Sequence, residues 1–154
     1  MEMDMLQVEI PLMEMVIRLI MAAGLALLLG LERELKGKPA GLRSHMLVSV
    51  GAATFIIMGL HILMTTAEGD PSARIDPSRI VEGVIGGIGF LGAGCIIQSR
   101  GHVQGITTGA SIWISGAIGV ACGLGTLVLA SIVTALALII ILILGRFERE
   151  VINE

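Results

Sequence analysis

The fold is decided by the stretch GHVQGITTGASIWISGAIGVACGLGTLVLASIVTALALIIILILG, residues 101–145, in which 45 consecutive positions hold no Asp, Glu, Lys or Arg. At a rise of about 1.5 Å per residue, this stretch would form roughly 67 Å of helix, about twice the ~30 Å hydrocarbon core of a bilayer. Composition agrees, because 55% of the 154 residues are hydrophobic and only 15% are charged, which leaves too little polar surface for a soluble domain of this size. The stretch therefore predicts two membrane crossings.

Apolar runs on the N-terminal side of this stretch predict three more crossings. The expected fold class is all-α, a polytopic membrane helix bundle that forms a single transmembrane domain over residues 1–154, without a soluble C-terminal domain. A cleaved signal peptide is rejected for the first run, because acidic residues precede it and Leu-Glu-Arg-Glu ends it. The last run is almost pure Leu, Ile, Val and Ala, so we expect it to face lipid. The five expected spans are residues 15–31, 44–64, 80–97, 106–122 and 126–144.

The positions of Lys and Arg predict the orientation of these spans. With five spans, seven of the ten basic residues fall on one side of the membrane, two fall on the other, and Arg18 lies within the first span. Basic residues in short loops stay in the cytoplasm, so the N-terminus is expected outside and the C-terminus inside. The seven cytoplasmic residues are Arg33, Lys36, Lys38, Arg43, Arg100, Arg146 and Arg149, and the two outer ones are Arg74 and Arg79.

The first polar motif is the loop GLERELKGKPAGLRSH, residues 30–45, between the first two spans. Its Gly and Pro residues predict a tight return of the chain. Positive-inside anchoring alone explains Lys36 and Lys38. Glu32 and Arg43 each lie at a helix end, where a buried partner across the hairpin would offset the cost of the charge. Structural ion pairing and a functional role both stay open for these two residues.

The second polar motif is the approach to the third span. Asp76 is placed to cap the helix, with Pro77 at its first position. Arg79 and Glu82 are three residues apart and share a helix face, which allows a local ion pair. Together with Arg18 they are expected to form a cluster near the outer interface. Ionisable groups at that depth are functional candidates, although snorkelling to the headgroups would also explain the arginines.

The third motif is GIGFLGAG, residues 87–94, which matches the glycine spacing of a dinucleotide fingerprint. A genuine fingerprint needs a preceding strand and an acidic residue about 20 positions on, but no Asp or Glu occurs between Glu82 and Glu148. Close helix packing is the preferred interpretation and predicts a central helix; a broken helix that lines an ion path is the alternative. The candidate packing residues are Gly83, Gly87, Gly89, Gly92 and Gly94.

Five runs in this chain resemble the MgtC/SapB family of bacterial inner-membrane proteins. They occur in the family's order and extend over most of the chain, from about residue 24 to the end of the fifth span. The runs are GLERE (30–34), GKPAGLRSH (37–45), DPSRI (76–80), GIGFLGAG (87–94) and GITTGASIW (105–113). The resemblance implies a multi-pass domain in the bacterial inner membrane, a link to magnesium homeostasis and, in some pathogens, a link to virulence. Many members also carry a soluble C-terminal domain.

The resemblance carries residues over by position. Two positions depart from the family pattern, because Gly83 stands where many members have a polar residue and Glu82 stands where a small residue is common. The positions that match are Glu32, Arg33, Gly41, Arg43, His45, Asp76, Arg79, Gly87, Gly89, Gly92, Gly94, Thr107 and Thr108.

Enzymatic chemistry has no support in the sequence, so we expect a protein that is not an enzyme. Cys95 and Cys122 lie in separate spans without CxxC spacing, which suggests neither zinc nor a disulfide. The three histidines are scattered over different segments. No cofactor is expected, the metal ligands are unknown, and magnesium is the one ion that the resemblance suggests.

Two functions fit these features. In the first, the protein regulates another membrane complex, such as an ATP synthase or a transporter, through its small-residue helix faces. In the second, it is a transporter or channel for magnesium or protons that uses Glu32, Asp76 and Glu82, although magnesium prefers an octahedral oxygen shell and dehydrates reluctantly. The expected partners are the lipid bilayer and a second copy in a homodimer, with no role for nucleic acid.

Overall fold

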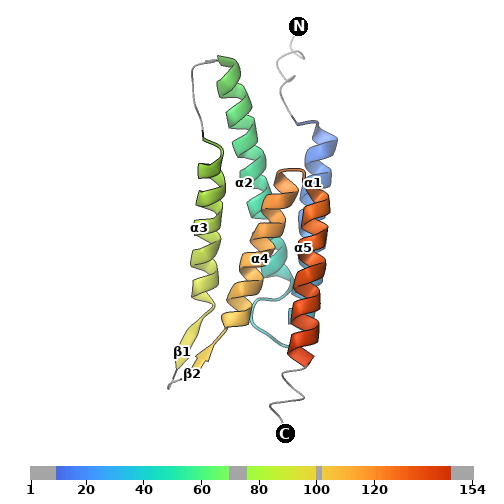
Figure 1. Cartoon of the computed structure of the whole chain (residues 1–154), viewed down its shortest axis with the longest axis vertical. Helices are drawn as coiled ribbons and strands as arrows, with labels where there is room; N and C mark the ends of the chain where they lie inside the picture. Colours follow the sequence, from blue (N-terminus) through green and yellow to red (C-terminus); the bar gives the residue numbers. More distant parts are fainter. Residues whose placement is uncertain (1–9, 70–75, 100–101, 147–154) are drawn as a thin grey trace.

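The structure is a computed structural model that describes residues 10–69, 76–99 and 102–146. It is an all-α bundle with one short β-hairpin, which confirms the expected fold class (Figure 1). The helices are α1 (Leu12–Leu35), α2 (Leu42–Gly69), α3 (Ser78–Gly94), α4 (Ile106–Gly123) and α5 (Leu127–Ile139), which continues as a π-helical turn (Ile140–Leu144). The strands are β1 (Ile97–Ser99) and β2 (His102–Gln104).

Four of the helices are long and apolar enough to cross a membrane: Leu12–Leu35, Leu42–Thr66, Ile106–Gly123 and Leu127–Leu144. Helix α3 has 17 residues, about 26 Å at the usual rise, and runs beside α2 and α4. Successive helices alternate in direction along the long axis of the molecule (Figure 1). The chain is therefore a multi-pass membrane protein.

The alternation places the basic residues as the orientation rule requires. The end of α1, the start of α2 and the end of α5 lie at one end of the bundle (Figure 1), and the start of α3, with Arg79, lies at the other. Three basic residues used in the orientation argument, Arg74, Arg100 and Arg149, lie outside the described residues. The orientation itself stays a prediction. The described basic residues at the first end are Arg33, Lys36, Lys38, Arg43 and Arg146.

The third span ends earlier than the expected boundary at residue 97. Helix α3 stops at Gly94, and the next residues form β1, which pairs antiparallel with β2. Gly105 closes this hairpin with a left-handed backbone, φ 88°, and lies so near Cys95 that a Cβ would collide with the Cys95 carbonyl oxygen. Only glycine accommodates both constraints. The hairpin was missed because three-residue strands carry almost no periodic signal.

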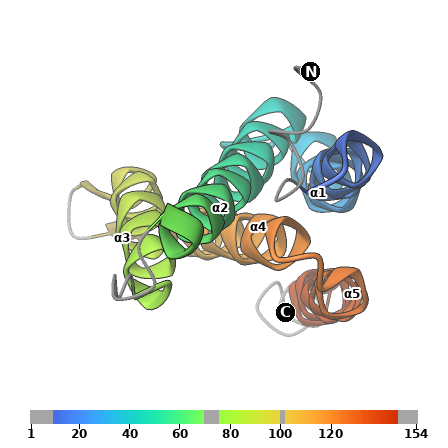
Figure 2. The ribbon, with the colours of Figure 1, turned by 90° about the horizontal axis from the view of Figure 1, so that it is seen from above.

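Helix α4 is the centre of the bundle (Figure 2). It contacts all four other helices, and 61% of it is buried, against 17% for the spans formed by α1 and α5. Its glycines allow close approach to α2, because a Cβ at Gly119 would collide with the carbonyl oxygen of Ser49. Small residues that admit a neighbouring backbone are the usual means of helix association in lipid. Gly119 therefore lets α4 pack closely against α2.

Helix α3 lies at the edge of the bundle and is not the central helix that its glycines predicted (Figure 2). Of the five candidate packing glycines, Gly92 meets a neighbour, the carbonyl oxygen of Gly109 on α4, at 3.1 Å from the position of an added Cβ. The other four face open space: Gly83, Gly87, Gly89 and Gly94. The prediction failed because α4 also carries small residues along its length, and it takes the central position.

Helix α5 is largely exposed, as expected of a lipid-facing span. One stripe of it is buried nevertheless, formed by Ala130, Thr134 and Ala137. Their spacing of four and three residues places them on one helix face, where Ala130 and Ala137 join an apolar core with Leu29 and Ile118. The span therefore does contain the small residues that permit packing.

Candidate functional site

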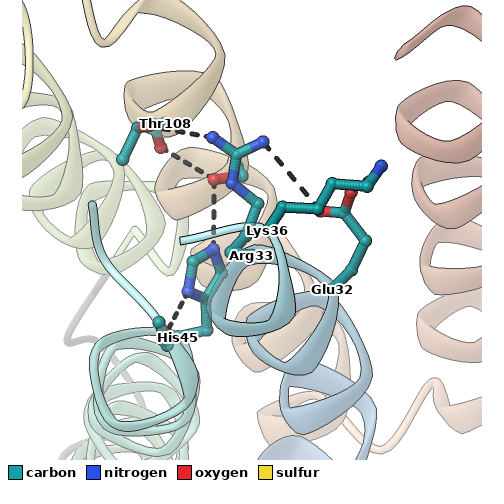
Figure 3. Close-up of polar contacts among 7 residues, drawn as sticks. Glu32, Arg33, Lys36, His45 and Thr108 are labelled. Atoms are coloured by element: carbon teal, nitrogen blue, oxygen red, sulfur yellow. Dashed lines mark hydrogen bonds and ion pairs between the residues drawn. The ribbon is translucent and has the colours of Figure 1, made fainter. Parts of the chain in front are cut away.

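A buried polar network joins three helices near one end of the bundle (Figure 3). Arg33 comes from the last turns of α1, His45 from the first turn of α2, and Thr108 and Ser111 from the start of α4. Arg33 is 5% exposed and His45 is 0% exposed, and both hydroxyl residues are buried as well. Polar groups at this depth need hydrogen-bond partners.

The hairpin between α1 and α2 places His45 beside α1. Gly37 has a left-handed backbone, φ 60°, and the Glu34 carboxylate accepts a hydrogen bond from the Leu42 backbone N–H at 2.8 Å, which satisfies one free donor at the start of α2. Gly30 has no side chain to separate the helices, since a Cβ there would lie 2.7 Å from the Leu42 Cα. The two helix ends are therefore in close contact.

The hydrogen bonds of the network link helices to one another. Arg33 Nη2 donates to Thr108 Oγ1 at 3.1 Å, which connects α1 to α4. His45 Nε2 lies 3.1 Å from Ser111 Oγ, which connects α2 to α4, and Nδ1 lies 2.8 Å from the Gly41 carbonyl oxygen. A carbonyl only accepts, so Nδ1 donates and Nε2 is the acceptor in a neutral ring. In that tautomer the single Ser111 hydroxyl proton has two acceptors within reach. These are His45 Nε2 and the Thr108 carbonyl oxygen, which lies 2.8 Å away.

The charged part of the network lies on the other side of Arg33. Glu32 Oε1 is 2.5 Å from Lys36 Nζ, and Oε2 is 3.9 Å from Arg33 Nη1. Glu32 and Lys36 extend away from Thr108, toward the end of α5 (Figure 3). Neither Glu32 oxygen has a hydrogen bond of good geometry among the described residues, and Arg33 Nε has none either. These groups are therefore held by ion pairing and not by full hydrogen bonding.

Among the described residues, neither Glu32 nor Arg43 has an ion-pair partner across the hairpin. Arg43 is exposed, and Glu32 pairs with Lys36 and Arg33 on its own helix. The residue that contacts α2 is Glu34. It lies two positions after Glu32, and residues two positions apart on a helix point in directions about 200° apart. Thr107 is also exposed, while its neighbour Thr108 joins the network. The sequence did not distinguish the two threonines.

Asp76, Arg79 and Glu82 lie at the opposite end of the bundle, near the start of α3, and all three are exposed. Asp76 caps the first turn, since its Oδ1 accepts a hydrogen bond from the Ser78 backbone N–H at 2.9 Å. Hydrogen bonds from the side chain and the backbone of Ser78 lower the pKa of Asp76. Pro77, with φ −65° and ψ −19°, already has helical geometry.

The expected cluster of Arg18 with Arg79 and Glu82 does not form. Helices α2 and α4 lie between α1 and α3 (Figure 2). Arg18 instead pairs with Glu14 and donates from Nη1 to the Gly123 carbonyl oxygen, 2.6 Å away, at the end of α4. Its positive charge there complements the negative end of the helix dipole.

Sequence reasoning missed Ser111 and treated Lys36 only as a cytoplasmic anchor. The sequence did carry a signal for Ser111. Thr108, Ser111 and Ser115 recur at spacings of three and four in a helix whose other residues, apart from Thr107, are apolar, and this spacing places them on one face. All three are buried, and Ser115 Oγ donates to the Ser111 carbonyl oxygen at 3.0 Å. Within the described ranges, no group of three or more His, Cys, Asp and Glu side chains could hold a metal ion.

Known proteins match this chain over most of its length. The MgtC family model matches residues 19–150. The protein named putative magnesium transporter YhiD of Escherichia coli strain K12 is 36% identical over 141 residues, which is 92% of this chain and 65% of that protein. No solved structure matches the chain.

Two further relatives come from other bacteria. Protein MgtC of Brucella abortus strain 2308 is 41% identical over 107 residues, which is 70% of this chain and 41% of that protein. Protein SrpB of Synechococcus elongatus is 39% identical over 142 residues, with 86% of this chain and 75% of that protein covered. The chain thus spans less than two thirds of the length of the YhiD and MgtC relatives.

Proposed function

This chain belongs to the MgtC family, and from that premise we propose that it serves magnesium homeostasis in the bacterial inner membrane as a non-enzymatic regulator of another membrane complex. The names of two relatives support the link to magnesium, since one is called a putative magnesium transporter and another MgtC. A transporter that uses Glu32, Asp76 and Glu82 is the competing proposal.

The separation of these three carboxylates is the observation that carries the regulator proposal. Glu32 lies at the end of α1, while Asp76 and Glu82 lie at the opposite end of the bundle. Between the two ends, the described core holds apolar side chains such as Leu29 and Ile118 and the hydroxyls of Ser115 and Thr134, but no buried carboxylate. Magnesium is usually held by carboxylates together with water molecules, and it dehydrates reluctantly. The described core of a single copy therefore offers it few ligands.

The polar network supports the same proposal because its contacts hold helices together. The bond from Arg33 to Thr108 fixes α1 on α4, and that between His45 and Ser111 fixes α2 on α4. Both hydrogen bonds lie at the end of the bundle opposite to Asp76 and Glu82. A network that fixes helices gives the bundle a defined surface, which a regulatory contact requires.

A groove between α3 and α5, with α4 at its base, is the surface that we assign to the regulated complex. It has a volume of about 180 Å³ and is lined by apolar and small residues that include Ile85, Trp113, Gly116, Ala117 and Leu129. Gly116 is already covered by the side chain of Ile88, but the small side chain of Ala117 at the base lets a partner backbone approach closely. The proposed occupant is a transmembrane helix of that complex.

A flux assay separates the two proposals. The full chain, reconstituted in liposomes loaded with a magnesium indicator, should give no more uptake than empty liposomes. Uptake that Glu32→Gln or Asp76→Asn abolishes, with protein insertion unchanged, would overturn the regulator proposal and support transport.

A crosslinking assay tests the regulatory contact itself. A photo-crosslinking amino acid at Ala117, in the groove, should capture a subunit of another membrane complex in native membranes at low magnesium. The same amino acid at Leu28, exposed on α1, is the matched control and should not capture it. The activity of the captured complex should change when this chain is deleted. Capture of this chain alone, or equal capture at both positions, would contradict the proposal.

A further inference from the structure

The outward face of α3 has no partner within the described chain. Gly83, Gly86 and Gly87 are exposed on it, and a Cβ added to any of them would meet nothing within 4 Å. Phe90 projects from the same side and is 80% exposed, whereas Ile88, two residues earlier, faces α4 and is buried. The helix therefore packs through one face and leaves a second face open.

Glycine weakens a helix, because it exposes the backbone and adds conformational freedom to the unfolded chain. On α4 the same cost is offset by close packing, as at Gly119 against α2. On the outward face of α3, none of the described residues makes use of the missing side chains. An open glycine face in a membrane helix is suited to contact with another helix at short distance.

Two opposite charges lie on this same face. Arg79 and Glu82 are three residues apart and exposed, and no ion pair joins them among the described residues. A carboxylate and a guanidinium that face lipid near a helix end gain from a partner of opposite charge. The two residues are about 4.5 Å apart along the helix axis. Their side chains are long enough to cover this difference in height, so Arg79 of one copy can meet Glu82 of an adjacent copy.

We propose that the outward face of α3 is the surface through which two copies of this chain pack, α3 against α3, about a two-fold axis along the membrane normal. A two-fold interface must be complementary to itself, and this face carries both members of each pair. Phe90 lies over the glycines of the second copy, and Arg79 of each copy lies beside Glu82 of the other. This inference is independent of the proposed regulatory function.

Disulfide crosslinking in native membranes tests the contact. In a background with Cys95→Ser and Cys122→Ala, Gly86→Cys should form a disulfide dimer on mild oxidation. Gly24→Cys is the matched control, because Gly24 is also exposed in a helix and also has open space around an added Cβ, but it lies on α1, across the bundle from α3 (Figure 2). The control should stay monomeric.

Charge exchange tests the arrangement of the two copies. Arg79→Glu and Glu82→Arg should each lower the association constant of the dimer about fivefold. The double exchange should restore the association constant. Gly86→Leu should also abolish the dimer, while Gly24→Leu should leave it unchanged. Equal crosslinking of Gly86→Cys and Gly24→Cys, or a double exchange that fails to restore the dimer, would overturn the proposal.

Discussion

The hydrogen bond between Arg33 and Thr108 joins two helices that are far apart in sequence, and its removal tests how the polar network stabilises the bundle. Arg33→Met keeps the length of the side chain and deletes the charge. Because Lys36 still lies 2.5 Å from Glu32, the remaining carboxylate keeps a partner, and we expect a loss of about 3 kcal/mol in unfolding free energy, the lower end for breaking a buried pair. Thr108→Val leaves Arg33 Nη2 without an acceptor and should cost about 1.5 kcal/mol.

The double variant separates the bond itself from these single costs. Cycles on helix contacts in membranes average about 0.6 kcal/mol and reach about 1.7 kcal/mol, and a charged donor places this pair near the upper value. We therefore expect a coupling of roughly 1 to 1.5 kcal/mol, measured by unfolding in mixed micelles of mild and denaturing detergent. Thr107→Val is the matched control, since Thr107 is exposed, and it should change stability by less than about 0.5 kcal/mol.

Two results would refute this reasoning. A coupling near zero would mean that Arg33 and Thr108 do not interact in the folded protein. Equal losses for Thr107→Val and Thr108→Val would mean that burial of the second threonine carries no energetic weight. In either case the network would not be the element that holds α1 on α4.

Three further predictions concern packing, pH and orientation. Gly119→Ala should lower the unfolding free energy by about 2 kcal/mol, because its Cβ collides with a backbone oxygen of α2, whereas Gly24→Ala, in open space, should be neutral or stabilising. The pKa of Asp76 is lowered in the folded protein from its ordinary value of 3.8, so the ionised carboxylate stabilises the fold at pH values above 3.8, and this stability is lost as the pH falls through the pKa of the folded state. The thermal midpoint of Asp76→Asn should therefore drop less than that of the unchanged protein between about pH 5 and pH 3. An impermeant maleimide should label Pro11→Cys in intact spheroplasts and Lys38→Cys only after permeabilisation, and the reverse pattern would invert the orientation.

The helices could be predicted from the sequence because a long uncharged run has few other solutions in lipid. Each expected span corresponds to a helix, with the third displaced at its C-terminal end, where Gly94 stops α3. The order of packing could not be predicted. Glycines on α3 and α4 give the same signal in the sequence, but Gly119 of α4 packs against a neighbouring helix while Gly83 and Gly87 of α3 face open space.

The polar site was predictable in part. Arg33, His45 and Thr108 lie in three of the runs that resemble the family, and the structure brings them into one network. The sequence could not show that Ser111 links His45 to α4, since that contact depends on the depth at which α2 and α4 cross. It also could not tell which carboxylate crosses the hairpin, because Glu32 and Glu34 both lie near the helix end, and only the helical phase separates them.

The two proposed contact surfaces lie on different sides of α3, so one copy can use both at once. Ile85 and Ile88 line the groove toward α5, whereas Gly86 and Phe90 lie on the outward face. Gly86→Leu should therefore abolish self-association and leave capture of the regulated complex at Ala117 unchanged, when both are measured in the same membranes. Loss of both contacts in that variant would mean that the dimer forms the docking surface, and the two sites would then be a single interface.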